Sequence, residues 1–167
     1  MSRRPNGLFL SQWKYTLDIL SETGLLGAKP SSSHIDQHHH LALDDGPLYS
    51  DSSQYHRLIA RVIYLTITHP ELCYLVHVLA QFMQSPRVSH WKDALRVLRY
   101  IKGHPGQGIF LRRDSALHLT VCCDFDRASW PLSHCSLTGY FIFLGCSHIS
   151  GKTKKQYTVS RSSAEAE

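Results

Sequence analysis

The chain has 167 residues, of which 43% are hydrophobic and 19% are charged. This composition excludes a disordered chain and indicates a globular protein with one core or two small ones. The 18 Lys and Arg residues outnumber the 13 Asp and Glu residues, so the net charge is +5. A basic chain favours a polyanionic partner such as nucleic acid without requiring one.

The five cysteines are an odd number and form no Cys-x-x-Cys pair, which indicates a reduced, intracellular protein. No stretch contains the roughly 18 consecutive apolar residues that a membrane-spanning helix needs, and the N-terminus lacks the apolar core of a signal peptide. We therefore expect no membrane partner. The nucleus or cytoplasm is favoured over the mitochondrion, and the oligomeric state stays open.

A first amphipathic helix is predicted near the N-terminus, capped by Ser11 and ended by Gly24 or Gly27. Its apolar face recurs at helical spacing through Trp13, Leu17 and Leu20. The segment 31–51 that follows is rich in Ser, His, Asp, Gly and Pro, which predicts a surface loop or linker.

Three more helices are predicted between residues 52 and 103, with short breaks between them. Asp51 or Ser52 opens the first, Pro70 begins the second, and Ser89 caps the third, which Gly103 ends. Each has an apolar face of period 3.6, so we expect one packed helical unit. The apolar positions are Tyr55, Leu58, Ile59, Val62, Ile63, Leu72, Leu75, Val76, Leu79, Met83, Trp91, Ala94, Leu95, Leu98 and Ile101.

The sequence changes character after Gly106. Short β-branched or aromatic runs, separated by turn residues, occupy 108–113, 116–126, 137–145 and 147–160. They predict an antiparallel meander over about 108–159, joined to the helices by the "GHPGQG" turn. The predicted fold class is therefore α+β, with an N-terminal helix and a three-helix unit followed by an antiparallel β-meander.

Two pairs of carboxylates are candidate metal ligands. Asp124 and Asp126 lie two residues apart near a strand end, so both side chains point to one face. The alternative is that both are turn formers. Glu165 and Glu167, in the terminal "SRSSAEAE", begin a helix, where acidic residues also complement the macrodipole.

The linker contains a second group of ligand types, which suits Zn²⁺ or Ni²⁺. Its members are His34, Asp36, His38, His39 and His40. A loop of this kind lacks the supporting hydrogen bonds that orient metal ligands, so a solvated polar loop is the alternative.

Basic side chains mark candidate nucleic-acid contacts. Lys92, Arg96 and Arg99 recur at i, i+4 and i+7 and so share one flank of a helix, a pattern suited to a phosphate backbone. A solvated helix face is the alternative. The residues Arg87, Arg112 and Arg113 flank that helix in sequence, and Lys152, Lys154 and Lys155 form a second basic group in "KTKK".

Several long blocks of the sequence resemble the polymerase of copia-type retrotransposons. They are "GLFLSQWKYTLDILSETGLLGAKPSS" at 7–32, the block at 54–103, and "TGYFIFLG" with "KTKKQYTVSRSSAEAE" at 138–167. The resemblance implies four regions. These are the end of a reverse transcriptase domain (1–30), a linker (31–51), a helical thumb or connection region (52–106) and a truncated ribonuclease H-like domain (107–167).

The resemblance also implies site residues. Asp124 in "CDFDR" matches the first ribonuclease H carboxylate, Asp126 is the neighbouring acid, and Glu167 matches the second carboxylate. The family's two further Asp lie beyond the last residue, and its Tyr-Val-Asp-Asp polymerase hairpin has no match. The implied cofactor is Mg²⁺ and the implied partner an RNA–DNA hybrid, but we expect at most one weak ion at Asp124, Asp126 and Glu167.

The sequence departs from the family pattern at Arg127 and Gly151, where the family has Trp. We therefore interpret the chain as a non-catalytic remnant of the polyprotein with at most weak nucleic-acid binding. The alternatives are a retained nucleic-acid-binding module that uses the basic helical unit, and a metal binder that uses the His-rich loop.

Overall fold

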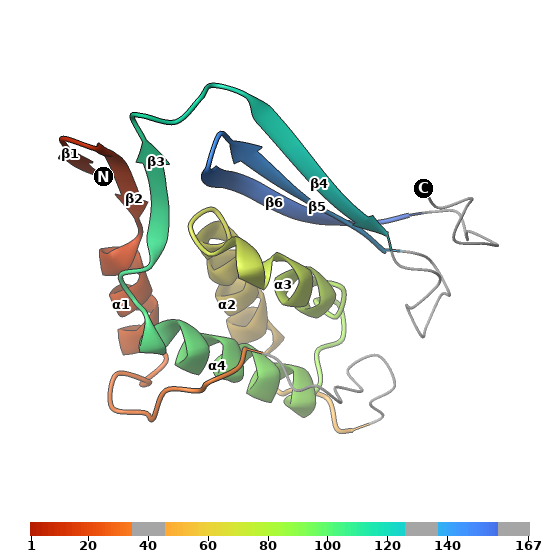
Figure 1. The fold of residues 1–167 in the computed structure, drawn as a ribbon. Helices are drawn as coiled ribbons and strands as arrows, with labels where there is room; N and C mark the ends of the chain where they lie inside the picture. The colour runs from red at the N-terminus through yellow and green to blue at the C-terminus, as the bar shows by residue number, and fades with distance from the viewer. Residues whose placement is uncertain (35–45, 126–136, 157–167) are drawn as a thin grey trace.

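The computed structural model describes residues 1–34, 46–125 and 137–156. These residues form a mixed α+β fold, with a layer of helices and two three-stranded antiparallel sheets. Figure 1 shows the first sheet beside α1 and the second above α2 and α3, while α4 runs below them.

The elements in chain order are β1 (Ser2–Arg4), β2 (Gly7–Ser11), α1 (Trp13–Glu22), α2 (Ser52–Leu65), the 3₁₀ helix η2 (Pro70–Leu72), α3 (Cys73–Ala80), α4 (Val88–Gly103), β3 (Gly108–Arg112), β4 (Leu119–Phe125), β5 (Leu137–Leu144) and β6 (Ser147–Lys155).

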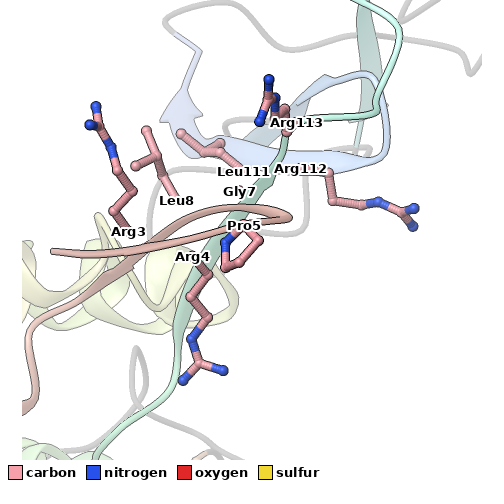
Figure 2. Close-up of a pocket in the computed structure, with 8 residues that line it drawn as sticks. All are labelled: Arg3, Arg4, Pro5, Gly7, Leu8, Leu111, Arg112 and Arg113. Atoms are coloured by element: carbon pink, nitrogen blue, oxygen red, sulfur yellow. The ribbon is translucent and has the colours of Figure 1, made fainter.

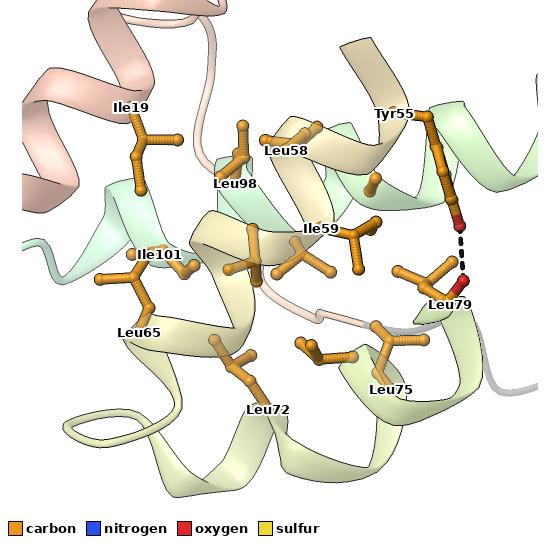
Figure 3. Close-up of a cluster of buried hydrophobic side chains, with 14 of the residues drawn as sticks. Ile19, Tyr55, Leu58, Ile59, Leu65, Leu72, Leu75, Leu79, Leu98 and Ile101 are labelled. Atoms are coloured by element: carbon orange, nitrogen blue, oxygen red, sulfur yellow. Dashed lines mark hydrogen bonds between the residues drawn. The ribbon is translucent and has the colours of Figure 1, made fainter. Parts of the chain in front are cut away.

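The hydrophobic core lies among the helices, as their apolar faces predict (Figure 3). Ile19 and Leu20 of α1 meet the buried faces of α2, α3 and α4. Tyr55 is fully buried, and its hydroxyl donates a hydrogen bond of 2.8 Å to the Leu79 carbonyl, so the one polar atom of this large side chain has a partner. The further buried members are Leu58, Ile59, Val62, Leu65, Leu72, Leu75, Val76, Val78, Ala94, Val97, Leu98 and Ile101.

Asp51 caps α2 as predicted, because its carboxylate accepts a hydrogen bond of 2.8 Å from the Gln54 amide. The predicted caps of two other helices are wrong. Ser11 is the last residue of β2, and Gln12 occupies the cap position of α1. Arg87 occupies that of α4, where the His90 side chain accepts the Arg87 amide hydrogen and leaves no role for Ser89.

Two residues expected on apolar faces are exposed instead. Trp13 is 56% exposed, because the buried side of α1 is formed by Thr16, Ile19 and Leu20. Ile63 is 43% exposed on α2. The other predicted apolar positions of α2, namely Tyr55, Leu58, Ile59 and Val62, are buried as expected.

The first sheet has the order β1-β2-β3 and joins the two ends of the helical region. β2 pairs with β3 from Gly7↔Arg112 to Ser11↔Gly108. The sequence patterns predicted neither β1 nor β2, and they placed β3 in the meander. That placement is wrong, since β3 pairs with β2.

The second sheet has the order β4-β5-β6, which is the predicted meander without β3. Its β6 packs on η2 and α3, where the Cys73 thiol donates to the Gly151 carbonyl at 3.1 Å. A side chain at 151 would begin 3.0 Å from the Phe141 ring and 3.4 Å from Pro70, so glycine permits this close approach. The Arg112 amide donates to the Ser147 hydroxyl at 3.3 Å and links the two sheets.

Within the described part of the chain, no helix has both the length and the apolar character to cross a membrane.

Candidate nucleic-acid interface and carboxylate site

Lys92, Arg96 and Arg99 lie along one flank of α4 and are called the α4 stripe below. Other residues of the same helix, including Val97 and Leu98, are buried in the core. Lys92 and Arg99 are exposed and Arg96 is half-buried. Because the core holds the helix backbone in place, these cations are presented from a rigid support. Such an array can contact successive phosphates of a nucleic acid.

Arg87 also has a structural role. Its half-buried guanidinium donates to the Gly46 carbonyl, and its backbone forms an isolated antiparallel bridge with Leu48. These contacts hold the segment before α2 against the start of α4. Arg87 is therefore less available to an external anion than the exposed members of the α4 stripe.

The basic group of β6 is divided between two faces of the sheet. Lys152 and Lys154 share one face and are exposed, while Lys155 lies on the other and is half-buried. Burial lowers the pKa of the nearby His77, and the positive charges of Lys155 and Lys152 lower it further. Figure 1 shows β6 above α3 and α4 below it, so the fold does not bring the β6 lysines to the α4 stripe.

Asp124 lies near the end of β4, opposite Gly139 of β5, and is exposed. It lines a pocket of about 380 Å³ between the second sheet and the η2–α3 segment. Glu71 and Lys152 line the same pocket. The fold thus places Asp124 at the same pocket as Glu71, a carboxylate that the sequence did not predict as part of this site. The predicted partners of Asp124, namely Asp126 and Glu167, lie outside the described residues.

Glu71 already has several partners within the protein. Its carboxylate contacts the His69 ring at 3.2 Å and accepts a hydrogen bond of 3.0 Å from the Gln107 amide. Burial raises the pKa of Glu71, but the hydrogen bonds from His69, its own backbone amide and Gln107 outweigh burial and leave the pKa below its ordinary value. A negative Glu71 can attract a cation, although Lys152 on the same pocket opposes this.

The His-rich loop is represented in the structure by His34 alone. Its half-buried ring packs 5.1 Å from the Tyr100 ring, and burial lowers its pKa while the charge of Glu71 partly opposes the shift. Asp36, His38, His39 and His40 lie outside the described residues. Among the residues described, no three His, Cys, Asp or Glu side chains are grouped as a metal ion would require.

A further basic feature was not predicted as a site. Arg3 and Arg4 of β1 and Arg112 and Arg113 at the end of β3 line an open pocket of about 690 Å³ (Figure 2). The signal in the sequence was the repeated Arg-Arg pair at 3–4 and 112–113. What brings the pairs together is the pairing of β2 with β1 and with β3, a strand about one hundred residues away in the sequence.

The chain is similar over nearly its whole length to proteins from mobile genetic elements. It is 41% identical over 165 residues to the retrovirus-related Pol polyprotein from transposon RE2 of Arabidopsis thaliana, and 39% identical over 165 residues to that from transposon RE1. It is also 38% identical to an uncharacterized mitochondrial protein of the same plant over 98% of this chain and 68% of the relative. The chain belongs to one family with this mitochondrial protein, and it is similar to a segment of the transposon Pol polyproteins.

The chain spans 11% of the length of each of the two Pol polyproteins. The match covers 99% of this chain in both cases, so it includes the α4 stripe and the Asp124 pocket. No family model and no solved structure matches the sequence.

Proposed function

We propose that this chain corresponds to the end of the reverse transcriptase and the start of the ribonuclease H of a copia-type Pol polyprotein, and that it binds nucleic acid without catalysing a reaction. The α4 stripe is the observation that carries the binding proposal. Three cations on a helix fixed by the core form the kind of surface that a phosphate backbone needs. The similarity to transposon Pol polyproteins supports the choice of nucleic acid.

The nucleic acid would be held mainly through its backbone, because Lys and Arg on one helix flank contact phosphates without reading base edges. Such binding weakens as salt rises, since each neutralised phosphate releases condensed counterions. The affinity is accordingly expected to be nearly independent of sequence.

The binding test compares Lys92→Gln/Arg99→Gln with a control pair, Lys14→Gln/Lys29→Gln, that removes the same charge from exposed positions outside the stripe. Fluorescence anisotropy with a labelled oligonucleotide measures affinity between 50 and 200 mM salt. The log–log salt slope of the stripe variant should fall by about 1.4 to 1.8, the contribution of two phosphate contacts. Equal slopes in the stripe variant and the control would contradict the proposal.

The absence of catalysis is proposed from the carboxylates. Two-metal hydrolysis requires ions roughly 3.5–4 Å apart, clamped by several carboxylates. Asp124 and Glu167 match the family's ligands, and Lys152 on the Asp124 pocket opposes a second positive charge there. The Mg²⁺ expected from the family would be held weakly, by Asp124 together with Asp126 and Glu167.

The catalytic test incubates the purified chain with a labelled RNA–DNA hybrid in Mg²⁺ or Mn²⁺, beside an Asp124→Asn control. We expect neither RNA cleavage nor primer extension. Cleavage by the parent chain that disappears in Asp124→Asn would refute the proposal.

A further inference from the structure

We infer that the open end of the first sheet is a second nucleic-acid site, which takes the phosphate backbone of a single strand. The inference rests on the proposed function only in its choice of ligand. The site, called the arginine trough below, consists of Arg3, Leu8, Leu111 and Arg113 (Figure 2).

The strand register places these four residues together. Arg3 of β1 is opposite Leu8 of β2, which is opposite Leu111 of β3, and directly opposed residues share one face of an antiparallel sheet. Arg113 follows two residues after Leu111, and its amide continues the pairing by donating to the Asn6 carbonyl at 2.9 Å. Figure 2 shows Arg3 and Arg113 pointing the same way, with Leu8 and Leu111 near them.

The spacing suits a chain of phosphates rather than one small anion. Strands about 4.8 Å apart and a rise of about 3.4 Å per residue separate the Arg3 and Arg113 backbones by about 12 Å. Two guanidiniums at this distance meet different phosphates, and the half-buried leucines between them offer an apolar surface to a sugar or an unstacked base. A single strand provides such groups, whereas a duplex keeps its bases stacked inside.

The charges on this face are not neutralised within the described chain. Arg3 and Arg113 are exposed, and no salt bridge joins either to a carboxylate in residues 1–34, 46–125 and 137–156. The opposite face differs. On that face, the Arg112 guanidinium donates two hydrogen bonds, of 3.0 and 2.7 Å, to the Asp114 carboxylate. Arg4 lies on the same face, because Arg4 and Arg112 both pair with Gly7. Arg pairs of this geometry leave fewer donors for a phosphate.

This asymmetry provides a matched control. Arg3→Gln/Arg113→Gln and Arg4→Gln/Arg112→Gln remove the same residue type and charge from β1 and from the end of β3, but from opposite faces. All four side chains are exposed, so both variants should keep the parent's urea midpoint. A third variant, Arg3→Lys/Arg113→Lys, restores the charge.

The experiment measures anisotropy of a labelled 20-nucleotide single strand against salt, with the same sequence as a duplex and inorganic tripolyphosphate as further arms. We expect Arg3→Gln/Arg113→Gln to lower the single-strand salt slope by about 1.4, which corresponds to two contacts at 0.7 each. The opposite-face variant should change the slope by less than half as much, and the Lys variant should restore most of it.

Three results would overturn the inference. The first is an equal loss in both double Gln variants, which would indicate only a general positive field. The second is tripolyphosphate binding as tight as that of the oligonucleotide, which would assign the site to free phosphates. The third is single-strand binding lost in Lys92→Gln/Arg99→Gln but intact in Arg3→Gln/Arg113→Gln, which leaves the proposed function standing without the trough. A parent chain that binds no oligonucleotide would refute both proposals.

Discussion

Gly7 is the first residue of β2, the central strand of the first sheet, and its backbone lies very close to β3. A Cβ atom at this position would lie 2.1 Å from the Leu111 carbonyl oxygen, and backbone cannot move aside as a flexible side chain can. Gly7→Ala should therefore lower the free energy of unfolding by about 1–3 kcal/mol, measured by urea denaturation.

The control for this prediction is Gly27→Ala, since nothing lies within 4 Å of a Cβ at Gly27. We expect a change within about 0.5 kcal/mol there. A Gly7→Ala variant as stable as Gly27→Ala would show that β2 and β3 do not pair in the described register.

His77, on α3, makes stability depend on pH. Burial, together with Lys155 and Lys152, holds its folded-state pKa below the ordinary value of 6.5. Below pH 6.5 the His77 ring takes up a proton more readily in the unfolded chain than in the folded chain, which favours unfolding. The free energy of unfolding is therefore unaffected by His77 above pH 6.5, and it decreases as the pH falls from 6.5 towards the folded-state pKa of His77.

The measurement is urea unfolding at pH 7.5 and 5.5. His77→Gln should lose less stability than the parent between these values, and Lys155→Gln should also lose less, because one of the opposing charges is gone. A pH dependence that is the same in His77→Gln as in the parent would contradict the assignment.

At the scale of elements, α2 depends on the residue that caps its N-terminus. The Asp51 carboxylate satisfies the Gln54 amide, one of the helix donors that no backbone carbonyl can reach. Asp51→Ala should destabilise the protein by about 1 kcal/mol. Ser53→Ala, at an exposed position two residues further along, should have little effect, and equal losses in the two variants would rule out the cap.

β4 is the least protected element of the second sheet. It is an edge strand, and its described side chains from 119 to 124 are all exposed, including Leu119 at 68% and Val121 at 55%. With little buried apolar surface to hold it, β4 should open at a low free-energy cost. Such an exposed apolar edge also invites pairing with other chains.

At the scale of the whole molecule, stability is concentrated in the helical layer. The core residues come from α1 to α4 and η2, whereas the second sheet contributes to the fold mainly through β6 on η2 and α3. Hydrogen exchange followed by mass spectrometry should find peptides from α2 and α4 protected far longer than peptides from β4. Equal protection would show that the two sheets and the helices open as one unit.

The sequence by itself determined the helices of this protein, because the signals for a helix are local. The 3.6-residue apolar period located α2, α3 and α4, Asp51 marked the start of α2, and Gly103 ended α4 where predicted. The same local logic placed Lys92, Arg96 and Arg99 on one flank, since positions at i, i+4 and i+7 always share a helix face.

Only the tertiary structure decided the pairing of the first sheet. β1 reads Ser-Arg-Arg and has no apolar alternation, and the partner of β2 begins about one hundred residues later in the chain, so no local pattern relates the two. The choice of partner depends on the helical core, which brings Gly7 opposite Arg112 and lets the backbones close their hydrogen bonds. That long-range pairing turns two separate Arg-Arg pairs into one arginine-lined pocket, a feature that exists in the fold and not in any stretch of the sequence.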